Sequence, residues 1–187
     1  MTLRSTLMAV TAVAALSTAA FAQDTMENPM VGGAEMMADM TIVENASNAP
    51  NLSTLVAAVQ QAELVETLSG EGPFTVFAPT DTAFEAVPAE TLESVMMDEN
   101  REMLQGILTY HVVEGTYTAE DLMAAIEAGG GSTNLTTVSG GTLTAQMDGD
   151  ALVVIDESGN GAAVETADVM QSNGVVHVID TVLMPAM

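Results

Sequence analysis

The chain has 187 residues, of which 48% are hydrophobic and only 3% aromatic, so we expect one domain whose core consists of small aliphatic side chains and methionine. Two basic residues stand against 26 acidic ones, which gives a formal net charge of -24 at pH 7. This charge excludes nucleic acid and anionic membrane surfaces as partners, because both require clustered cations. The absence of cysteine excludes disulfides and a lipidated N-terminal cysteine.

The first 22 residues have the pattern of a secretory signal peptide. Arg4 supplies the positive start, residues 7–16 form a short apolar run, and Ala20-Phe21-Ala22 is a small-x-small cleavage site. The apolar run is shorter than the ~20 residues that a membrane span needs, and no later segment reaches that length. We therefore expect a soluble product, secreted or periplasmic, that begins at Gln23 and does not insert into a membrane.

Residues 23–40 form a methionine-rich N-terminal arm. Pro29 and the pair Gly32-Gly33 argue against regular structure there. One hypothesis is a thioether site for Cu(I), because soft metals prefer sulfur ligands, and it would make the protein a periplasmic metal or small-ligand binder. The other hypothesis is an adaptable arm that packs on the domain, and the absence of nearby His and Cys favours it. The methionines are Met26, Met30, Met36, Met37 and Met40.

Residues 41–187 are expected to form the folded domain, beginning with helices. Apolar side chains recur at i, i+3 and i+4 through 41–68, which predicts a helical region. Pro88 opens a second helix at a position where proline is tolerated. A third helix is expected over 101–108, and a fourth begins after the capping residue Thr118 and ends in a run of glycines.

The stretch from Gly72 to Phe84 organises the core. Phe74 and Phe77 lie in a run that is apolar at both odd and even positions, which predicts a short strand buried on both faces. The strand ends at Pro79 because proline has no N–H to donate to the ladder. The next two residues, Thr80 or Asp81, can cap a helix that carries Phe84 into the core.

A short β-rich run is expected at residues 110–113, and from Ser132 onward the signals are those of strands and glycine turns. Helices followed by strands favour an α+β domain. The early strand that starts at Phe74 must join the later sheet, so the topology is non-local. The expected late strands cover residues 110–113, 135–138, 142–147, 151–155, 162–165 and 175–180.

Three segments together resemble the fasciclin-I-like family, also called FAS1 or beta-Ig-H3 domains. The first is T-V-F-A-P-T-D-T-A-F, from Thr75 to Phe84, and the second is the pair Tyr110-His111 after I-L-T. The third is G-V-V-H-V-I-D-T-V-L-M-P, from Gly174 to Pro185. Each block alone is weak, but the three in order are specific. The departure from the family is the complete absence of lysine.

The resemblance implies a wedge-shaped β-sandwich with helices packed along one side. It also implies a secreted adhesion or interaction module rather than an enzyme, with a protein or polysaccharide partner at the cell envelope or in the extracellular matrix. In animal relatives the tyrosine–histidine region is linked to receptor binding. The resemblance therefore points to Tyr110, His111, Val112 and Val113 as partner-binding residues.

The residues themselves offer little chemistry. His111 is expected to be buried, with its ring bonded to the backbone or to Asp81, and His177 is expected to be structural and paired with Asp180. Two His and no Cys cannot complete a zinc site without carboxylates, and no serine lies in a G-x-S-x-G motif. We therefore predict no catalytic residues, no metal site and no cofactor, and a hydrolase built on stray carboxylates is the weaker alternative.

A further segment begins like a calcium-binding loop. Asp156-x-Ser158-x-Asn160-Gly161 matches the start of an EF-hand loop, but Ala167 stands where the pattern requires a bidentate glutamate. The EF-hand pattern therefore fails. We expect only weak, non-specific calcium binding to the acidic surface.

Overall fold

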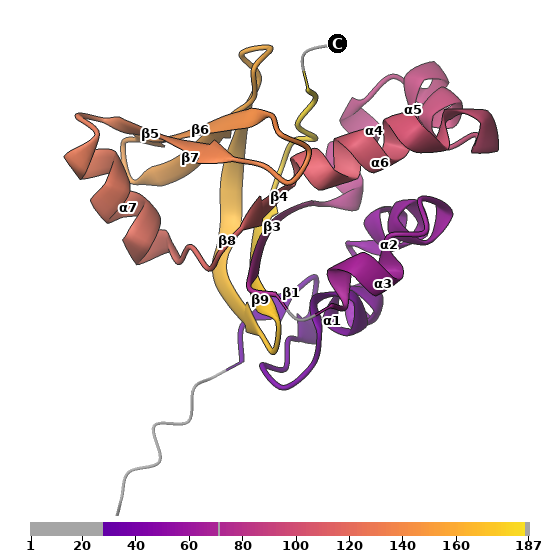
Figure 1. The fold of residues 1–187 in the computed structure, drawn as a ribbon. Helices are drawn as coiled ribbons and strands as arrows, with labels where there is room; N and C mark the ends of the chain where they lie inside the picture. Colours follow the sequence, from indigo (N-terminus) through magenta and orange to yellow (C-terminus); the bar gives the residue numbers. More distant parts are fainter. Residues whose placement is uncertain (1–27, 71, 186–187) are drawn as a thin grey trace, which may run out of the picture.

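A curled β-sheet forms the centre of the computed structural model, which describes residues 28–70 and 72–185 (Figure 1). The predicted signal peptide and Met26 lie outside these ranges. The sheet has the strand order β4-β3-β9-β8-β7-β6-β5. Its strands are β3 (Phe74–Pro79), β4 (Val112–Glu114), β5 (Ser132–Thr136), β6 (Thr142–Asp148), β7 (Ala151–Ile155), β8 (Gly161–Gln171) and β9 (Gly174–Ile179).

The two ends of the sheet approach each other, so that its halves enclose a core. Val113 of β4 forms a bridge with Thr137, just beyond β5, and the Val138 N–H donates to the Val112 carbonyl at 2.8 Å. The long strand β8 connects the two halves, because it pairs with β7 at its start and with β9 along the rest. This arrangement has the two facing layers expected of a β-sandwich.

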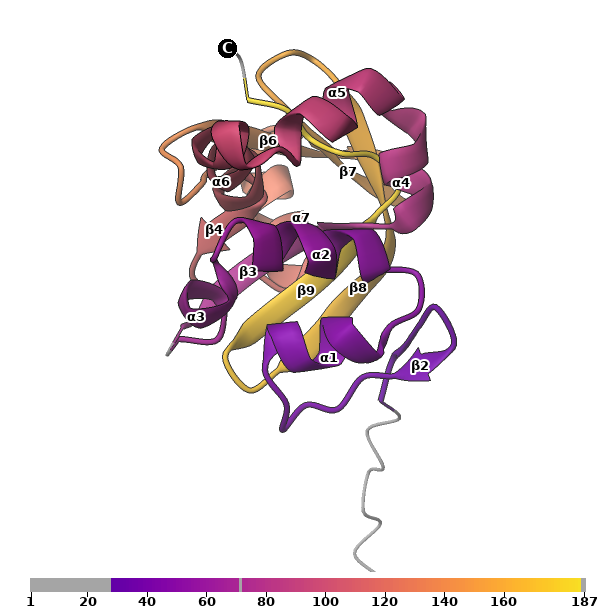
Figure 2. The same cartoon turned by 90° about the vertical axis from the view of Figure 1, so that its right-hand side faces the viewer.

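Helices cover one side of the β3-β9-β8 half, and helix α7 lies on the other side (Figures 1 and 2). The expected helix over 41–68 is in fact three helices, because Pro50 disfavours helical geometry at Ala49 and Glu63 takes a left-handed φ of 58°. The helices are α1 (Ile42–Asn48), α2 (Ser53–Gln61), α3 (Val65–Leu68), α4 (Asp81–Ala86), α5 (Ala89–Val95), the 3-10 helix η1 (Asp98–Asn100), α6 (Arg101–Tyr110) and α7 (Ala119–Ala128).

The strand expected at 110–113 begins later than its sequence suggests. Helix α6 continues through Tyr110, and β4 starts only at Val112. Tyr, His and Val favour strands, but this preference depends on context and gives way to packing. Here the helical turn carries the Tyr110 side chain into the interior, where it is fully buried.

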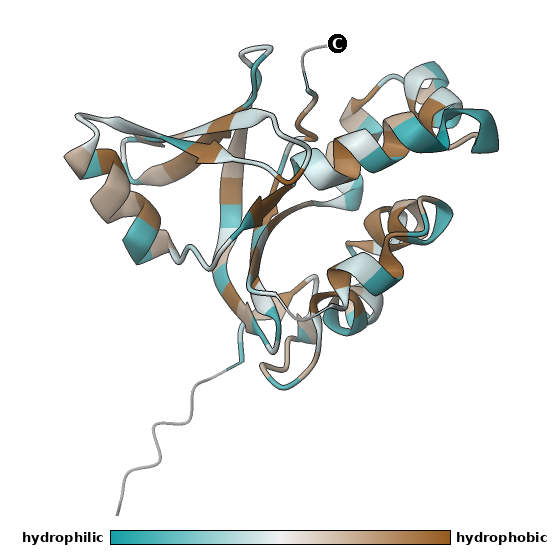
Figure 3. Cartoon of the chain, in the orientation of Figure 1, coloured by the Kyte–Doolittle hydropathy of each residue, from teal (hydrophilic) through white to brown (hydrophobic). Residues whose placement is uncertain are grey.

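The predicted strand β3 is buried on both faces, as its sequence indicates. It pairs in parallel with β9, and Phe77 lies opposite His177. Hydrophobic residues gather on the strands at the centre of the sheet (Figure 3). Side chains that alternate along β3 enter two different cores. The helical core lies between the helices and the sheet and includes Ile42, Leu52, Leu55, Val59, Leu68, Val76, Ala78, Phe84, Leu104, Leu108, Val176 and Val178.

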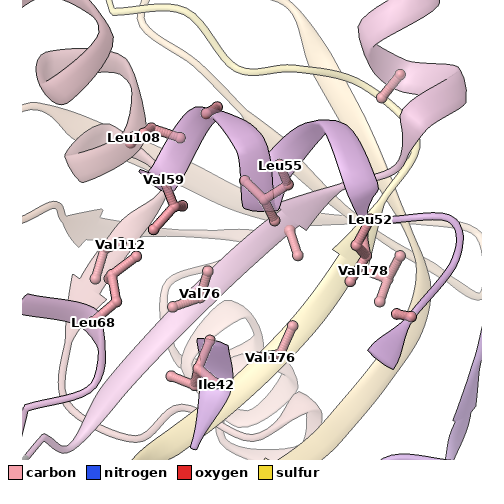
Figure 4. Packing of buried hydrophobic residues seen from close by; sticks show 14 of the residues in the cluster. Ile42, Leu52, Leu55, Val59, Leu68, Val76, Leu108, Val112, Val176 and Val178 are labelled. Carbon is pink, nitrogen blue, oxygen red and sulfur yellow. The ribbon is translucent and has the colours of Figure 1, made fainter. Parts of the chain in front are cut away.

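The second core, here called the barrel core, lies between the two halves of the sheet. Its members are Phe77, Tyr110, Val113, Leu122, Ile126, Leu135, Leu143, Ala145, Leu152, Val154, Ala162, Ile179 and Leu183. Figure 4 shows the other side of the same strands, where side chains of α2 stand over β3 and β9. The central strands therefore connect both cores. Phe74, at the start of β3, is half-buried against the helical core.

The turn after β3 follows the predicted capping scheme. Pro79 is the last residue of β3, and the Thr80 hydroxyl accepts the Ala83 N–H at 3.4 Å to cap α4. Asp81 does not cap this helix. Its carboxylate accepts the Ser53 hydroxyl at 2.6 Å and the Thr54 N–H at 2.8 Å, so it connects α4 to the start of α2.

The N-terminal arm has regular structure, contrary to the sequence-based expectation. β1 (Met30–Val31) and β2 (Ala34–Glu35) pair as an antiparallel hairpin. Gly32 and Gly33 supply positive φ angles of 60° and 88° for the turn, and a Cβ on Gly32 would overlap the Asn51 side chain. Because Met36 is only 2% exposed and belongs to the helical core, residues 30–36 pack as part of the domain rather than as a separate arm.

Candidate functional site

Tyr110 connects three segments that are distant in the sequence. Its hydroxyl donates to the Thr142 carbonyl at 3.0 Å and accepts the Glu157 N–H at 3.0 Å. These bonds tie the end of α6 to the start of β6 and to the turn after β7. Burial raises the pKa of Tyr110 above its ordinary value, so the phenol stays protonated and donates at neutral pH.

His111 joins two of the three segments that carry the family resemblance. Its Nε2 accepts the Leu183 N–H at 3.0 Å, so the proton lies on Nδ1, which donates to the Ile107 carbonyl at 2.8 Å. Burial lowers the pKa of His111 to about 4, although the bond to Ile107 and the charge of Asp156 act in the opposite direction. The ring is therefore neutral at pH 7. Its partners are backbone groups, and Asp81 is not among them.

The other two residues of the expected partner-binding group are also interior. Val112 faces the helical core and Val113 the barrel core, and both are buried. A partner that docks on the folded domain therefore meets none of the four side chains from Tyr110 to Val113. In this structure the tyrosine–histidine motif braces the fold from inside.

Asp156 is a third brace, which the sequence reasoning assigned only to a failed calcium loop. One carboxylate oxygen accepts the Ser158 N–H at 2.9 Å and the Asn160 N–H at 2.8 Å. The other accepts the Asn160 side-chain amide and the Met184 N–H, both at 3.0 Å. Both oxygens are thus directed at N–H donors, which leaves a cation little access. The Asp-x-Ser-x-Asn pattern that resembles a metal loop is here the signal of a self-bonded turn.

His177 is buried between the halves of the sheet, but its expected pairing with Asp180 is wrong. Its Nε2 donates to the Tyr117 carbonyl at 2.8 Å, its Nδ1 accepts the Asp168 N–H at 3.4 Å, and burial lowers its pKa. The ring stacks on Phe77 with centroids 5.6 Å apart. Asp180 instead accepts the Ala163 N–H at 2.9 Å.

Metal-ligand groups do not converge in the part of the chain that the structure describes. Within 28–70 and 72–185, no group of three or more His, Asp or Glu side chains is placed to hold a metal ion. The arm methionines are also divided, because Met30 is 62% exposed while Met36 is buried. The geometry of the described arm therefore favours packing over a shared thioether site.

The hollows of the domain are small and apolar, or wide and open. One cavity of about 30 Å³ lies beneath α1 and α2, and a second of about 30 Å³ lies beneath α5 and α6. The Leu108 and His111 side chains border both cavities. An open depression of about 640 Å³ lies near Pro73 and the turn between β8 and β9. None of the three presents a buried acid–base pair.

The sequence profile of the family described as the fasciclin domain matches residues 50–185. The chain belongs to the fasciclin domain family. It is 47% identical over 166 residues to protein sll1483 of Synechocystis, covering 88% of this chain and 84% of that protein. It is 36% identical over 170 residues to the cell surface glycolipoprotein MPB83 of Mycobacterium bovis, covering 88% of this chain and 70% of that protein.

In two further comparisons, most of this fasciclin domain matches part of a longer protein. The transforming growth factor-beta-induced protein ig-h3 of Sus scrofa is 36% identical over 133 residues, which are 71% of this chain and 17% of that protein. A solved FAS1 domain pair from the insect cell adhesion molecule fasciclin I has a TM-score of 0.70 at 22% identity. This match covers 78% of the chain and 51% of the domain pair, so it confirms the FAS1 fold. No helix in the described ranges is long and apolar enough to cross a membrane.

Proposed function

We propose that this fasciclin domain is a secreted adhesion or interaction module that binds a protein or polysaccharide at the cell envelope or in the extracellular matrix. The similarity to a cell surface glycolipoprotein over 88% of the chain is the observation that carries the proposal. The predicted signal peptide is consistent with an exported chain. We propose no catalytic role for any of its residues.

The state of the interior residues supports a binding role rather than a catalytic one. The two histidines bond to backbone groups inside the fold, and burial keeps both neutral at pH 7. Tyr110 and Asp156 are likewise engaged with backbone groups. A partner is therefore recognised by the exposed surface, while these residues hold the strands that display it.

The direct test is binding of the purified chain to the producer's own cells and to their extracellular polysaccharide. It is run in saline with and without calcium, with the heat-unfolded chain as the control for non-specific adsorption. Saturable binding by the folded chain alone is expected. Absence of saturable binding to either material would refute the proposal.

The alternative function, a periplasmic metal or small-ligand binder, depends on the exposed arm methionines such as Met30 and Met37. A Cu(I) titration in the presence of a competing chelator distinguishes the two proposals. Affinity tighter than about micromolar, lost on replacing both methionines by leucine, would favour the alternative. N-terminal sequencing of the exported protein tests the predicted start at Gln23.

A further inference from the structure

One strand pair at the surface of the domain carries almost no charge. Acidic residues make up 26 of 187 positions, about one in seven, yet residues 128–147 contain no charged residue at all. This stretch contains β5 and all of β6 except its last residue, Asp148, and the two strands pair as an antiparallel hairpin at the end of the sheet. The hairpin is therefore a neutral region on a strongly acidic protein.

The outward side chains of this hairpin form three cross-strand pairs. Alternate residues point inward to the barrel core, and the others are exposed or half-exposed. The outward pairs face one another across the two strands and carry only hydroxyl or amide groups. We call this surface the neutral face, and its pairs are Ser132 with Gln146, Asn134 with Thr144, and Thr136 with Thr142.

The neutral face continues onto the neighbouring strands as a low apolar strip. Gln146 pairs with Val153 and Thr144 with Ile155 on β7, and Val153 pairs in turn with Ala163 on β8. A Cβ on Gly161 would lie 3.3 Å from a Val153 methyl group, so small residues on β8 keep this side of the sheet shallow. Charged side chains lie at the last position of β6 (Asp148), in the turns that flank β7 (Asp150, Asp156 and Glu157), and farther along β8.

The polar groups on the neutral face are largely free to bind a ligand. Among the described residues, only the Thr144 hydroxyl and the Asn134 amide oxygen bond to each other, at 3.2 Å. The structure shows no side-chain hydrogen bond within the described part of the chain for the remaining four residues of the face, Ser132, Thr136, Thr142 and Gln146. Donors and acceptors thus repeat about every 6.7 Å along each strand and about every 4.8 Å between strands.

We propose that the neutral face binds an uncharged polysaccharide chain laid across β5, β6 and β7. The proposal rests on the adhesion function above and names the partner class and the surface. Hydroxyl and amide groups complement the repeating hydroxyls of a neutral glycan, and the Val153–Ile155 strip contacts its C–H faces. The acidic surface elsewhere does not repel an uncharged ligand. An acidic glycan or a second copy of this chain, in contrast, is repelled by the net charge of -24.

The experiment measures depletion of the full chain from solution by insoluble cellulose and by cross-linked dextran, with calcium polyuronate gel and the producer's cells alongside. The face variant Thr144→Glu/Gln146→Glu places two charges in the middle of the neutral face. The control Gln60→Glu/Thr67→Glu makes the same changes at exposed positions of α2 and α3. A milder variant, Thr144→Val/Asn134→Ala, removes hydrogen-bonding groups with little risk to the fold.

The expected result is binding of the parent to at least one neutral glycan, with an affinity that changes less than twofold between low and high salt. The face variant should bind at least tenfold more weakly and the milder variant at least threefold more weakly, while the control binds as the parent does. Circular dichroism and the melting temperature establish that each variant is folded.

Three results would overturn the proposal while the adhesion function stands. In the first, the parent binds a neutral glycan and the folded variants bind it equally well. In the second, the parent binds only the polyuronate gel or the cells, and does so only with calcium. In the third, sedimentation experiments show that the neutral face mediates self-association, and no glycan is bound. If the parent binds neither glycan, gel nor cells, the adhesion function itself fails.

Discussion

Replacing His111 by leucine removes two buried hydrogen bonds while keeping an apolar side chain of similar size. The Leu183 N–H and the Ile107 carbonyl lose their ring partners. A buried polar group without a partner destabilises by about 1–3 kcal/mol, so the two together predict a loss of about 2–6 kcal/mol. For a domain of this length the melting temperature should fall by about 5–15 °C.

The same substitution should change how stability depends on pH. Burial lowers the pKa of His111 to about 4 in the folded chain, against about 6.5 when unfolded. The unfolded chain binds the extra proton between these values, so the stabilisation is complete above pH 6.5 and is lost as the pH falls toward 4. Between about pH 7.5 and about pH 5.5 this one residue accounts for a loss of about 1 kcal/mol.

Urea unfolding of parent and His111→Leu at both pH values, in salt that screens the acidic surface, measures the two effects. Met103→Leu, on the exposed side of the same helix, is the control and should behave as the parent does. His177 has its pKa lowered by burial and contributes in the same direction in every variant. A His111→Leu protein as stable as the parent at about pH 7.5, or with the parent's full pH slope, would refute the bracing role.

Three further predictions concern glycine, salt and methionine. Gly106→Ala adds a Cβ that meets nothing within 4 Å, so it should stabilise α6 by about 0.5–1 kcal/mol. Gly141→Ala places a Cβ 2.5 Å from the Tyr110 ring, so it should destabilise the domain by about 1–3 kcal/mol. Urea unfolding measures both effects. Raising NaCl from about 0.01 M to about 0.5 M should raise the melting temperature by screening the net charge, and an unchanged value contradicts this. Mild peroxide should oxidise the exposed methionines before the buried Met36, as followed by peptide mass spectrometry, and early oxidation of Met36 in a folded chain would contradict the packing of the arm. Within 28–70 and 72–185 the exposed methionines are Met30, Met37, Met97, Met103, Met123 and Met170.

The sequence predicts best where local chemistry decides the structure. The run that ends at Pro79 reads as a doubly buried strand, and the structure places it at the centre of the sheet. The caps at Thr80 and Thr118 follow from side-chain oxygens that accept first-turn N–H groups. Glycine turns separate the hairpins of the last third as expected.

The sequence predicts less where contacts between distant parts of the chain decide the structure. The left-handed conformation of Glu63 divides two helices and has no local signature. An apolar run cannot reveal that Val112 and Val113 face two different cores and leave no surface for a partner. Likewise, the role of Asp156 depends on Met184, which reaches it only after the chain has returned along β9.

The parallel pairing of β3 with β9 makes completion of the fold a late event. Phe74 and Gly174 are about a hundred residues apart, and contacts of such long separation slow folding because a large loop must close first. Residues of β9 belong to both cores, so neither core is complete without it. Proteolytic loss of β9 would leave β3 and β8 with apolar, unpaired edges, and such edges promote aggregation. We expect this fasciclin domain to fold as one cooperative unit, with no stable N-terminal fragment to display a binding surface by itself.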